Sequence, residues 1–164
     1  MNMDSEKLGK ILATLITEAY EGPENPKMTW FVDNEAGSGI LGTMEKLSGE
    51  EASRPLAPGD RTTPASHSAH LRFSLNLANR ALRGENVHSS ADWKSSWATG
   101  EVTEQEWRGL IADLRREYLS LKVAIASGLP WSDDMNLTGI FSMLAHGAWP
   151  LGALRQGLGL VRAP

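Results

Sequence analysis

The stretch that decides the fold is residues 103–121, TEQEWRGLIADLRREYLSL. Its large apolar residues recur every three or four positions, which is the spacing of one face of an α-helix. The residues on this face are Trp107, Leu110, Ile111, Leu114, Tyr118 and Leu121. Thr103 followed by Glu106 forms a capping-box pattern at the start, and Gly128 with Pro130 marks the end. The stretch therefore predicts a long helix that buries one face against other helices.

Three further long helices are expected, two before this stretch and one after it. The first covers residues 4–20, with apolar residues at helical spacing and a Gly-Pro pair behind it. Its apolar residues are Leu8, Ile11, Leu12, Leu15 and Ile16. The second covers residues 64–83, with Thr63 as N-cap, Pro64 in the first turn and Gly84 at its end. The fourth begins at residue 132 or 133 and reaches about residue 158. Four long helices without strand alternation predict an all-α, four-helix-bundle domain covering residues 1–164.

The connection between the first two helices, residues 23–62, is rich in proline, glycine and acidic residues. One short helix is expected inside it, at residues 39–47. Irregular connections of this length are uncommon and often functional, so this one is a candidate lid or cleft wall. The alternative is a loop that Trp30 and Phe31 pack over the end of the bundle.

Composition excludes several classes of function. The chain has no cysteine, which rules out cysteine-ligated zinc, thiol nucleophiles and disulfide frameworks. Its formal net charge is −4 without a basic cluster, so we expect no nucleic-acid partner. The apolar stretch 135–154 contains Asn136, His146 and Pro150, and a buried helix explains it better than a membrane span. With no apolar segment at the N-terminus, a cytoplasmic protein is expected.

Two of the four histidines share one face of the second helix. At about 100° per residue, His67, His70, Ser74 and Ala81 point to the bundle interior. The opposite, solvated face is expected to carry Arg72, Asn76, Asn79 and Arg83. A buried imidazole must be hydrogen-bonded or ligated, so these two are either satisfied core residues or ligands. His88 lies in the polar connection 84–100 and is expected to be exposed.

A third histidine, His146, lies on the fourth helix, which is apolar on nearly all sides and is therefore expected to sit centrally. Its large apolar stripe is Leu137, Ile140, Phe141, Leu144 and Leu151. The face that carries His146 has small residues, which either admit a close neighbour or leave a pocket: Gly139, Ser142 and Ala153, together with Trp149. Pro150 cannot donate to the carbonyl of His146, so a kink, a π-type bulge or a break is expected there.

These histidine-bearing segments resemble the DinB-like family. Residues 145–156, AHGAWPLGALRQ, are similar to a family motif that reads roughly A-H-x-A-Y-H-L-G-x-I-R-Q, and residues 65–71 are similar to the family's histidine-bearing second helix. Weaker similarities occur at residues 20–23 and 29–31 and at the tryptophans before the third helix. The resemblance implies an up-down-down-up bundle, often homodimeric. It also implies a divalent metal, nickel or zinc, held by three histidines.

The resemblance places metal ligands at His70 and His146, while Pro150 replaces the third histidine and His67 is the candidate substitute. The pocket is expected to be lined by Ser74, Ser142, Trp149 and Pro150. The favoured hypothesis is a DinB-like protein of uncharacterised function with a degenerate or weak metal site. The alternative is a metal-dependent thiol S-transferase that joins a small thiol of the bacillithiol, mycothiol or glutathione type to an electrophile. A purely structural homodimer, with its interface on the first or third helix, is the third hypothesis.

Overall fold

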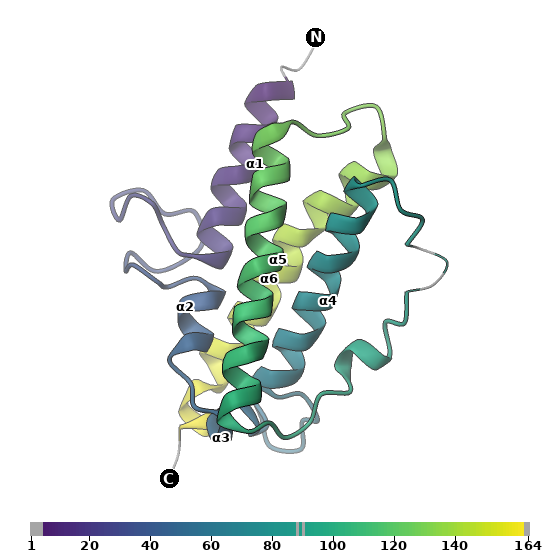
Figure 1. Ribbon diagram of the computed structural model, residues 1–164. Coiled ribbons are helices and arrows are strands. Elements are labelled where there is room, and N and C mark those ends of the chain that lie inside the picture. The colour runs from purple at the N-terminus through teal and green to yellow at the C-terminus, as the bar shows by residue number, and fades with distance from the viewer. Residues whose placement is uncertain (1–4, 88, 90, 163–164) are drawn as a thin grey trace.

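The computed structural model describes residues 5–87, 89 and 91–162, and these residues form helices with no strand among them (Figure 1). The helices are α1 (Ser5–Tyr20), α2 (Ile40–Glu45), α3 (Gly49–Ala52), α4 (Pro64–Leu82), α5 (Glu104–Ser127) and α6 (Asp134–Val161), with a 3-10 turn η1 (Ser95–Trp97) before α5. The prediction of an all-α protein is confirmed. Two short helices, α2 and α3, occupy the connection in which one was expected.

The four long helices each pack against two of the others. Helices α4 and α1 both lie against α5, and the same two helices lie against α6. In Figure 1, α1 and α6 run from the top of the molecule to the bottom, whereas α4 and α5 run from the bottom to the top. His67, His70 and His146 lie between α4 and α6.

Capping residues set where the long helices begin. The hydroxyl of Thr63 accepts from the backbone N–H of Ser66, and the Ser66 hydroxyl accepts in return from Thr63. Thr103 and Glu106 make the equivalent box at the start of α5, as predicted. Asp133 caps α6 by accepting from the N–H of Asn136. Such caps satisfy N–H groups that have no partner within the helix, and they thereby fix the register of the side chains that follow.

Aromatic residues fill the interior on the α1–α5 side. Trp107 is fully buried, and its indole N–H donates to the carbonyl of Leu47 at 2.9 Å. The Tyr20 ring stacks on Tyr118 with centroids 4.8 Å apart. On its other side Tyr20 lies against Gly147 of α6, where an added Cβ would come within 2.8 Å of the ring. Glycine at this position therefore lets α6 approach α1 closely.

The connection after α1 is held by a carboxylate, and its aromatic residues do not pack inward. Glu18 is buried, and its Oε1 accepts from the backbone N–H groups of Trp30, Phe31 and Val32 at 2.7, 2.8 and 3.1 Å. Trp30 and Phe31 are exposed, and Val32 is buried in their place. The expectation that Trp30 and Phe31 pack this loop over the bundle is therefore wrong, because three backbone donors order the loop without them.

The helical periodicity predicted the wrong solvent exposure for three side chains. Ile11 and Phe141 belong to predicted apolar stripes but are exposed. Asn79, predicted to be solvated, is 3% exposed, and its amide donates to the carbonyl and the carboxylate of Glu117. Helical spacing defines a face, but the neighbouring helix decides what that face meets. Here α5 covers the polar side of α4 with a residue that can accept hydrogen bonds.

Helix α6 continues through Pro150, so the predicted break or π-type bulge is not found. Pro150 is buried, and it lies one residue before Leu151 of the core and three after Gly147, which packs against Tyr20. The expectation of a central α6 is also wrong, because one of its faces is open to solvent. Within the described part of the chain, no helix combines the length and apolar character that a membrane crossing needs.

Candidate functional site

Helices α4 and α6 and the connection before α5 bring three histidines and three tryptophans together. This histidine–tryptophan cluster consists of His67, His70, Trp93, Trp97, His146 and Trp149. The rings of His70 and His146 are nearly parallel, with centroids 5.8 Å apart. His70 also stacks on Trp97 at 3.9 Å. Helical geometry alone aligns His67 with His70, but only the fold places His146 opposite them.

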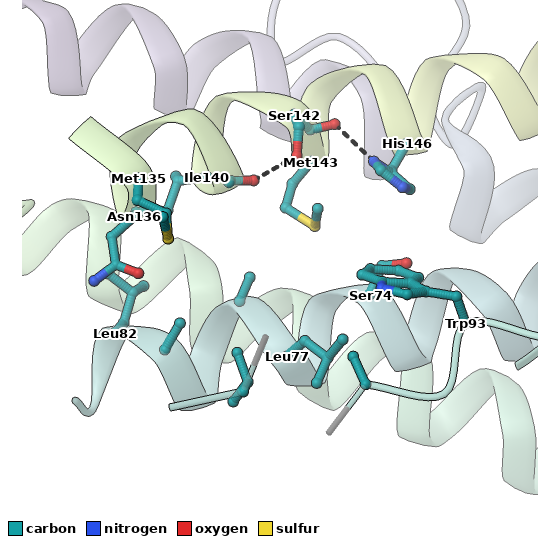
Figure 2. Close-up of a pocket in the computed structure, with 15 residues that line it drawn as sticks. Ser74, Leu77, Leu82, Trp93, Met135, Asn136, Ile140, Ser142, Met143 and His146 are labelled. Atoms are coloured by element: carbon teal, nitrogen blue, oxygen red, sulfur yellow. Dashed lines mark hydrogen bonds between the residues drawn. The ribbon is translucent and has the colours of Figure 1, made fainter. Parts of the chain in front are cut away.

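Hydrogen bonds fix which nitrogen of two histidines carries the proton. The Nδ1 of His70 lies 2.8 Å from the Ser96 hydroxyl, whose own proton is donated to the carbonyl of Trp93 at 2.7 Å. The hydroxyl oxygen therefore accepts, and Nδ1 of His70 donates. His146 donates from Nδ1 to the carbonyl of Ser142 at 3.1 Å (Figure 2). In their neutral forms both imidazoles consequently carry the lone pair on Nε2, where it can accept a proton or bind a ligand.

The two histidines of α4 are neutral at physiological pH. Burial lowers the pKa of His67 to about 4, against a smaller opposing effect of Asp60. Burial, together with smaller effects of the neighbouring His146 and His67, lowers the pKa of His70 to about 4. The Nδ1 of His67 is buried without a hydrogen-bond partner in the described structure. Such an orphaned polar atom is uncommon in native proteins. The described structure has two others, Asn79 Oδ1 and the Tyr118 hydroxyl, and of the three only the His67 nitrogen belongs to the histidine–tryptophan cluster.

A pocket of about 240 Å³ adjoins the cluster between α4, α6 and the connection that follows α4. Its apolar wall includes Leu77, Ala78, Leu82, Val87, Ile140 and Met143. Polar atoms come from four residues, Ser74, Asn136, Ser142 and His146. Figure 2 shows Trp93 and His146 at one end of the pocket, and Met135 and Asn136 at the other. An apolar cavity of about 150 Å³ already binds benzene, so this volume suits a small aromatic or branched molecule.

The structure brings some of the predicted site residues to this pocket and leaves others outside it. Ser74 and Ser142 line it, as does His146. Trp149 is exposed, with its ring 5.2 Å from that of His67, and Pro150 is buried in α6 without lining the pocket. No residue of the 23–62 connection lines it either. The fourth histidine of the sequence, at position 88, lies outside the described residues.

Among the lining residues that the sequence did not single out, two stand at the ends of the pocket. Trp93 forms the wall under His146, with ring centroids 6.5 Å apart, and Asn136 supplies an amide at the far end. The signal for Trp93 was a pair of tryptophans in an otherwise polar connection. Such residues need a surface to cover, and the rings of His70 and Phe73 on α4 lie against Trp93, with centroids 6.0 and 5.4 Å away. Nothing in the pattern of α6 distinguished Asn136.

The ligand set that the resemblance implies is not assembled here. Among residues 5–87, 89 and 91–162, no group of three or more His, Cys, Asp or Glu side chains is placed to hold one metal ion. His70 and His146 face each other, while Pro150 offers no donor atom. The residues present therefore do not fit a three-histidine metal centre.

Comparisons of the chain with protein-family models, with curated proteins and with solved structures give no match. The pocket and the histidine–tryptophan cluster are therefore the features of the molecule that indicate its function.

Proposed function

We propose that this protein is a DinB-like four-helix-bundle protein that binds a small, largely apolar molecule carrying one polar group, in the pocket beside its degenerate histidine site. The observation that carries the proposal is the apolar pocket of about 240 Å³ that ends at His146 and Trp93. Two features support the DinB-like bundle: the directions of the four long helices and the meeting of the predicted metal positions His70 and His146. A cytoplasmic location is part of this proposal.

Each group at the pocket has a definite part in binding. The apolar wall removes the hydrocarbon part of the ligand from water, which is the main favourable term. The indole of Trp93 offers a flat surface at the histidine end. The carbonyl of Ser142 holds the His146 ring so that Nε2 carries the free lone pair, and an O–H or S–H group of the ligand donates to it. At the opposite end of the pocket, the side-chain amide of Asn136 can accept a hydrogen bond from the ligand or donate one to it.

This binding does not depend on a metal. A weak nickel or zinc site at His70 and His146 remains a separate prediction of the resemblance, and no step of the proposed function passes through it. Treating the purified protein with a chelator is therefore expected to leave the affinity for a small apolar ligand unchanged. A loss of that affinity after chelation would contradict the proposal.

The enzymatic alternative, a thiol transferase, is favoured by one observation: an imidazole nitrogen with a fixed lone pair borders an apolar pocket. In this reading Nε2 of His146 takes the S–H proton of a small thiol. The thiolate then forms an S–C bond with an electrophilic carbon, and the leaving group departs with its electron pair. Glutathione with 1-chloro-2,4-dinitrobenzene is a suitable probe, since chloride is the leaving group. A rate above background that His146→Ala removes would favour the enzyme.

The binding proposal is tested by calorimetric titration with p-cresol and toluene, which have nearly the same shape. Both are expected to bind, and p-cresol more tightly by about fivefold, because one hydrogen bond contributes about 1 kcal/mol. His146→Ala should abolish this preference while toluene still binds. Equal affinities of the unaltered protein for the two molecules would remove His146 from the proposed role.

A pair of glycine substitutions locates the binding. Gly139 lines the pocket, and a Cβ added there meets nothing within 4 Å, so Gly139→Leu is expected to fill the cavity without disturbing the helix. Gly109 of α5 also has open space at its Cβ and lies away from the pocket, which makes Gly109→Leu the matched control. We expect Gly139→Leu to abolish toluene binding and Gly109→Leu to retain it. Equal binding by both variants would contradict the proposed site.

A further inference from the structure

Three polar side chains that line the histidine end of the pocket already donate their protons inside the protein (Figure 2). The Ser74 hydroxyl donates to the carbonyl of His70 at 2.9 Å, and the Ser142 hydroxyl donates to the carbonyl of Gly139 at 2.7 Å. The third side chain is that of His146, which donates from Nδ1 to the carbonyl of Ser142. A serine hydroxyl and a neutral imidazole each have one proton to donate. Toward a molecule in the pocket, all three groups therefore act as hydrogen-bond acceptors.

Two other side chains among the described lining residues carry N–H groups, and neither changes the character of the histidine end. Asn136, at the far end, donates one amide proton to Oδ2 of Asp133 at 2.7 Å and keeps its second N–H and its oxygen for a ligand. The indole N–H of Trp93 lies in the plane of its ring, so a molecule that stacks on the ring face does not meet it. The histidine end consequently favours a ligand group that donates a hydrogen bond.

The wall of the pocket offers no partner for a charged ligand. Of the described residues that line it, none is an aspartate, a glutamate, a lysine or an arginine. Burying an unpaired charge costs far more free energy than burying a neutral polar group that is hydrogen-bonded. An ammonium group would leave water without a carboxylate to pair with, and a carboxylate would place its oxygens against other acceptors. The polar group that suits this pocket is therefore neutral.

The apolar wall suits a flat ring. The indole of Trp93 gives an aromatic surface at one end, and the thioethers of Met135 and Met143 lie along the pocket (Figure 2). Rings stack favourably on other rings, and sulfur makes favourable contacts with ring edges. The volume of about 240 Å³ exceeds the roughly 150 Å³ of a cavity that holds benzene, which leaves room for a second fused ring.

We infer, resting on the proposed function, that the pocket selects a neutral aromatic molecule whose polar group is an N–H donor without an acceptor, as in an indole. An indole nitrogen donates and does not accept, because its lone pair belongs to the ring. A phenol also donates, but its oxygen carries lone pairs that would face the acceptors on Ser74, Ser142 and His146. A ketone, an ester or an ether offers acceptors alone, so the pocket discriminates against these classes.

Calorimetric titration of the full chain with three bicyclic molecules of nearly the same shape tests this ligand class. Indole has an N–H donor in its five-membered ring, benzofuran has an oxygen at that position, and indene has neither. At pH 8, where free imidazole is neutral, indole is expected to bind at least about fivefold more tightly than benzofuran, because only indole donates a hydrogen bond. Benzofuran should bind no more tightly than indene, because its oxygen would face other acceptors.

A pair of glutamine substitutions on α6 provides the matched test. His146→Gln replaces an acceptor with an amide that can also donate, so the preference for indole over benzofuran should fall below about twofold while indene still binds. Thr138→Gln places the same side chain on the exposed side of the helix, outside the pocket, and should keep the fivefold preference. The ratio measured on the unaltered protein decides the inference even if His146→Gln does not fold.

The outcomes separate this inference from the proposed function. If toluene and indene bind but the unaltered protein binds benzofuran as tightly as indole, the inference is overturned and the apolar pocket remains a binding site. If indole, indene and toluene all fail to bind, the proposed function itself is contradicted. Benzylamine, a cation at pH 8, and benzoate, an anion, are both expected to bind more weakly than indole, and tighter binding of either would also overturn the inference.

Discussion

The α1–α5 side and the α4–α6 side of this molecule are built differently. On the first, Tyr20 stacks on Tyr118, and the buried indole of Trp107 donates to a backbone carbonyl. On the second, Trp93 and Trp149 are exposed, one nitrogen of His67 is buried without a partner, and a pocket of about 240 Å³ remains. Aromatic residues serve to fill space on one side and to surround it on the other.

The difference indicates which part of the fold is less favourable in free energy. A closely packed interior leaves few voids, and a cavity or an unpaired polar atom costs free energy that neighbouring contacts must offset. The α1–α5 side supplies those contacts. The Tyr118 hydroxyl on the α1–α5 side is also buried without a hydrogen-bond partner in the described structure. What distinguishes the α4–α6 side is an apolar pocket that adjoins the histidine–tryptophan cluster, and this combination points to it as the place of function.

The largest expected effect is the loss of the buried tryptophan. Trp107→Ala should lower the free energy of unfolding by about 4 kcal/mol, because it removes a fully buried aromatic ring and leaves a cavity. Trp149→Ala, on the exposed side, should change the stability of the monomer by less than about 0.5 kcal/mol. Urea denaturation of the two variants measures both. Similar losses would show that the two sides are not energetically distinct.

The second effect is a pH dependence of stability between pH 7.5 and pH 5, which we attribute to a buried histidine on the α4–α6 side. His67 has a pKa of about 4 in the folded protein against 6.5 in a free chain. Between these values the unfolded chain binds the proton that the folded imidazole refuses, so stability is complete above pH 6.5 and falls as the pH is lowered. The loss at pH 5 should be about 2 kcal/mol.

His67→Leu tests this dependence, because it removes the titrating group together with the unpartnered nitrogen. Urea denaturation at pH 7.5 and at pH 5 should show a smaller fall than in the unaltered protein, by about 2 kcal/mol. At pH 7.5 the variant should be at least as stable. An unchanged fall would mean that His67 takes up a proton in the folded protein.

The helices were predictable because their signals are local. The spacing of apolar residues and the Thr103–Glu106 capping box placed α5, and Thr63 placed α4, within a residue or two of their ends. It was less predictable which faces of each helix other helices would bury. Asn79 is buried because Glu117 of another helix reaches it, and the outward side of α6 is exposed because none of the helices that the structure describes within residues 5–162 covers it. Neither fact is contained in the spacing of a single helix.

The candidate site also has one part that the sequence predicted and another that it did not. The common face of His67, His70 and Ser74 followed from helix geometry, and all three are buried. The apposition of His146 to His70 came only from the resemblance, and the wall formed by Trp93 depends on the path of an irregular connection. Periodic patterns determine which way a helical residue points, but they contain no information on how a loop returns across the fold.

The smallest expected effect concerns the hydroxyl of Ser96, which holds the His70 ring and the Trp93 backbone together. Ser96→Ala removes the acceptor for Nδ1–H and should cost about 1 kcal/mol. Its more informative consequence is on the tautomer of His70, which loses the bond that keeps the proton on Nδ1. Nitrogen-15 chemical shifts at pH 7 should show His70 moving from the Nδ1–H form toward a mixture, while His146, held by the Ser142 carbonyl, keeps its form. If His70 retains the Nδ1–H form in this variant, the cluster is ordered by ring stacking on Trp97 and not by hydrogen bonding, and Ser96 has no positioning role.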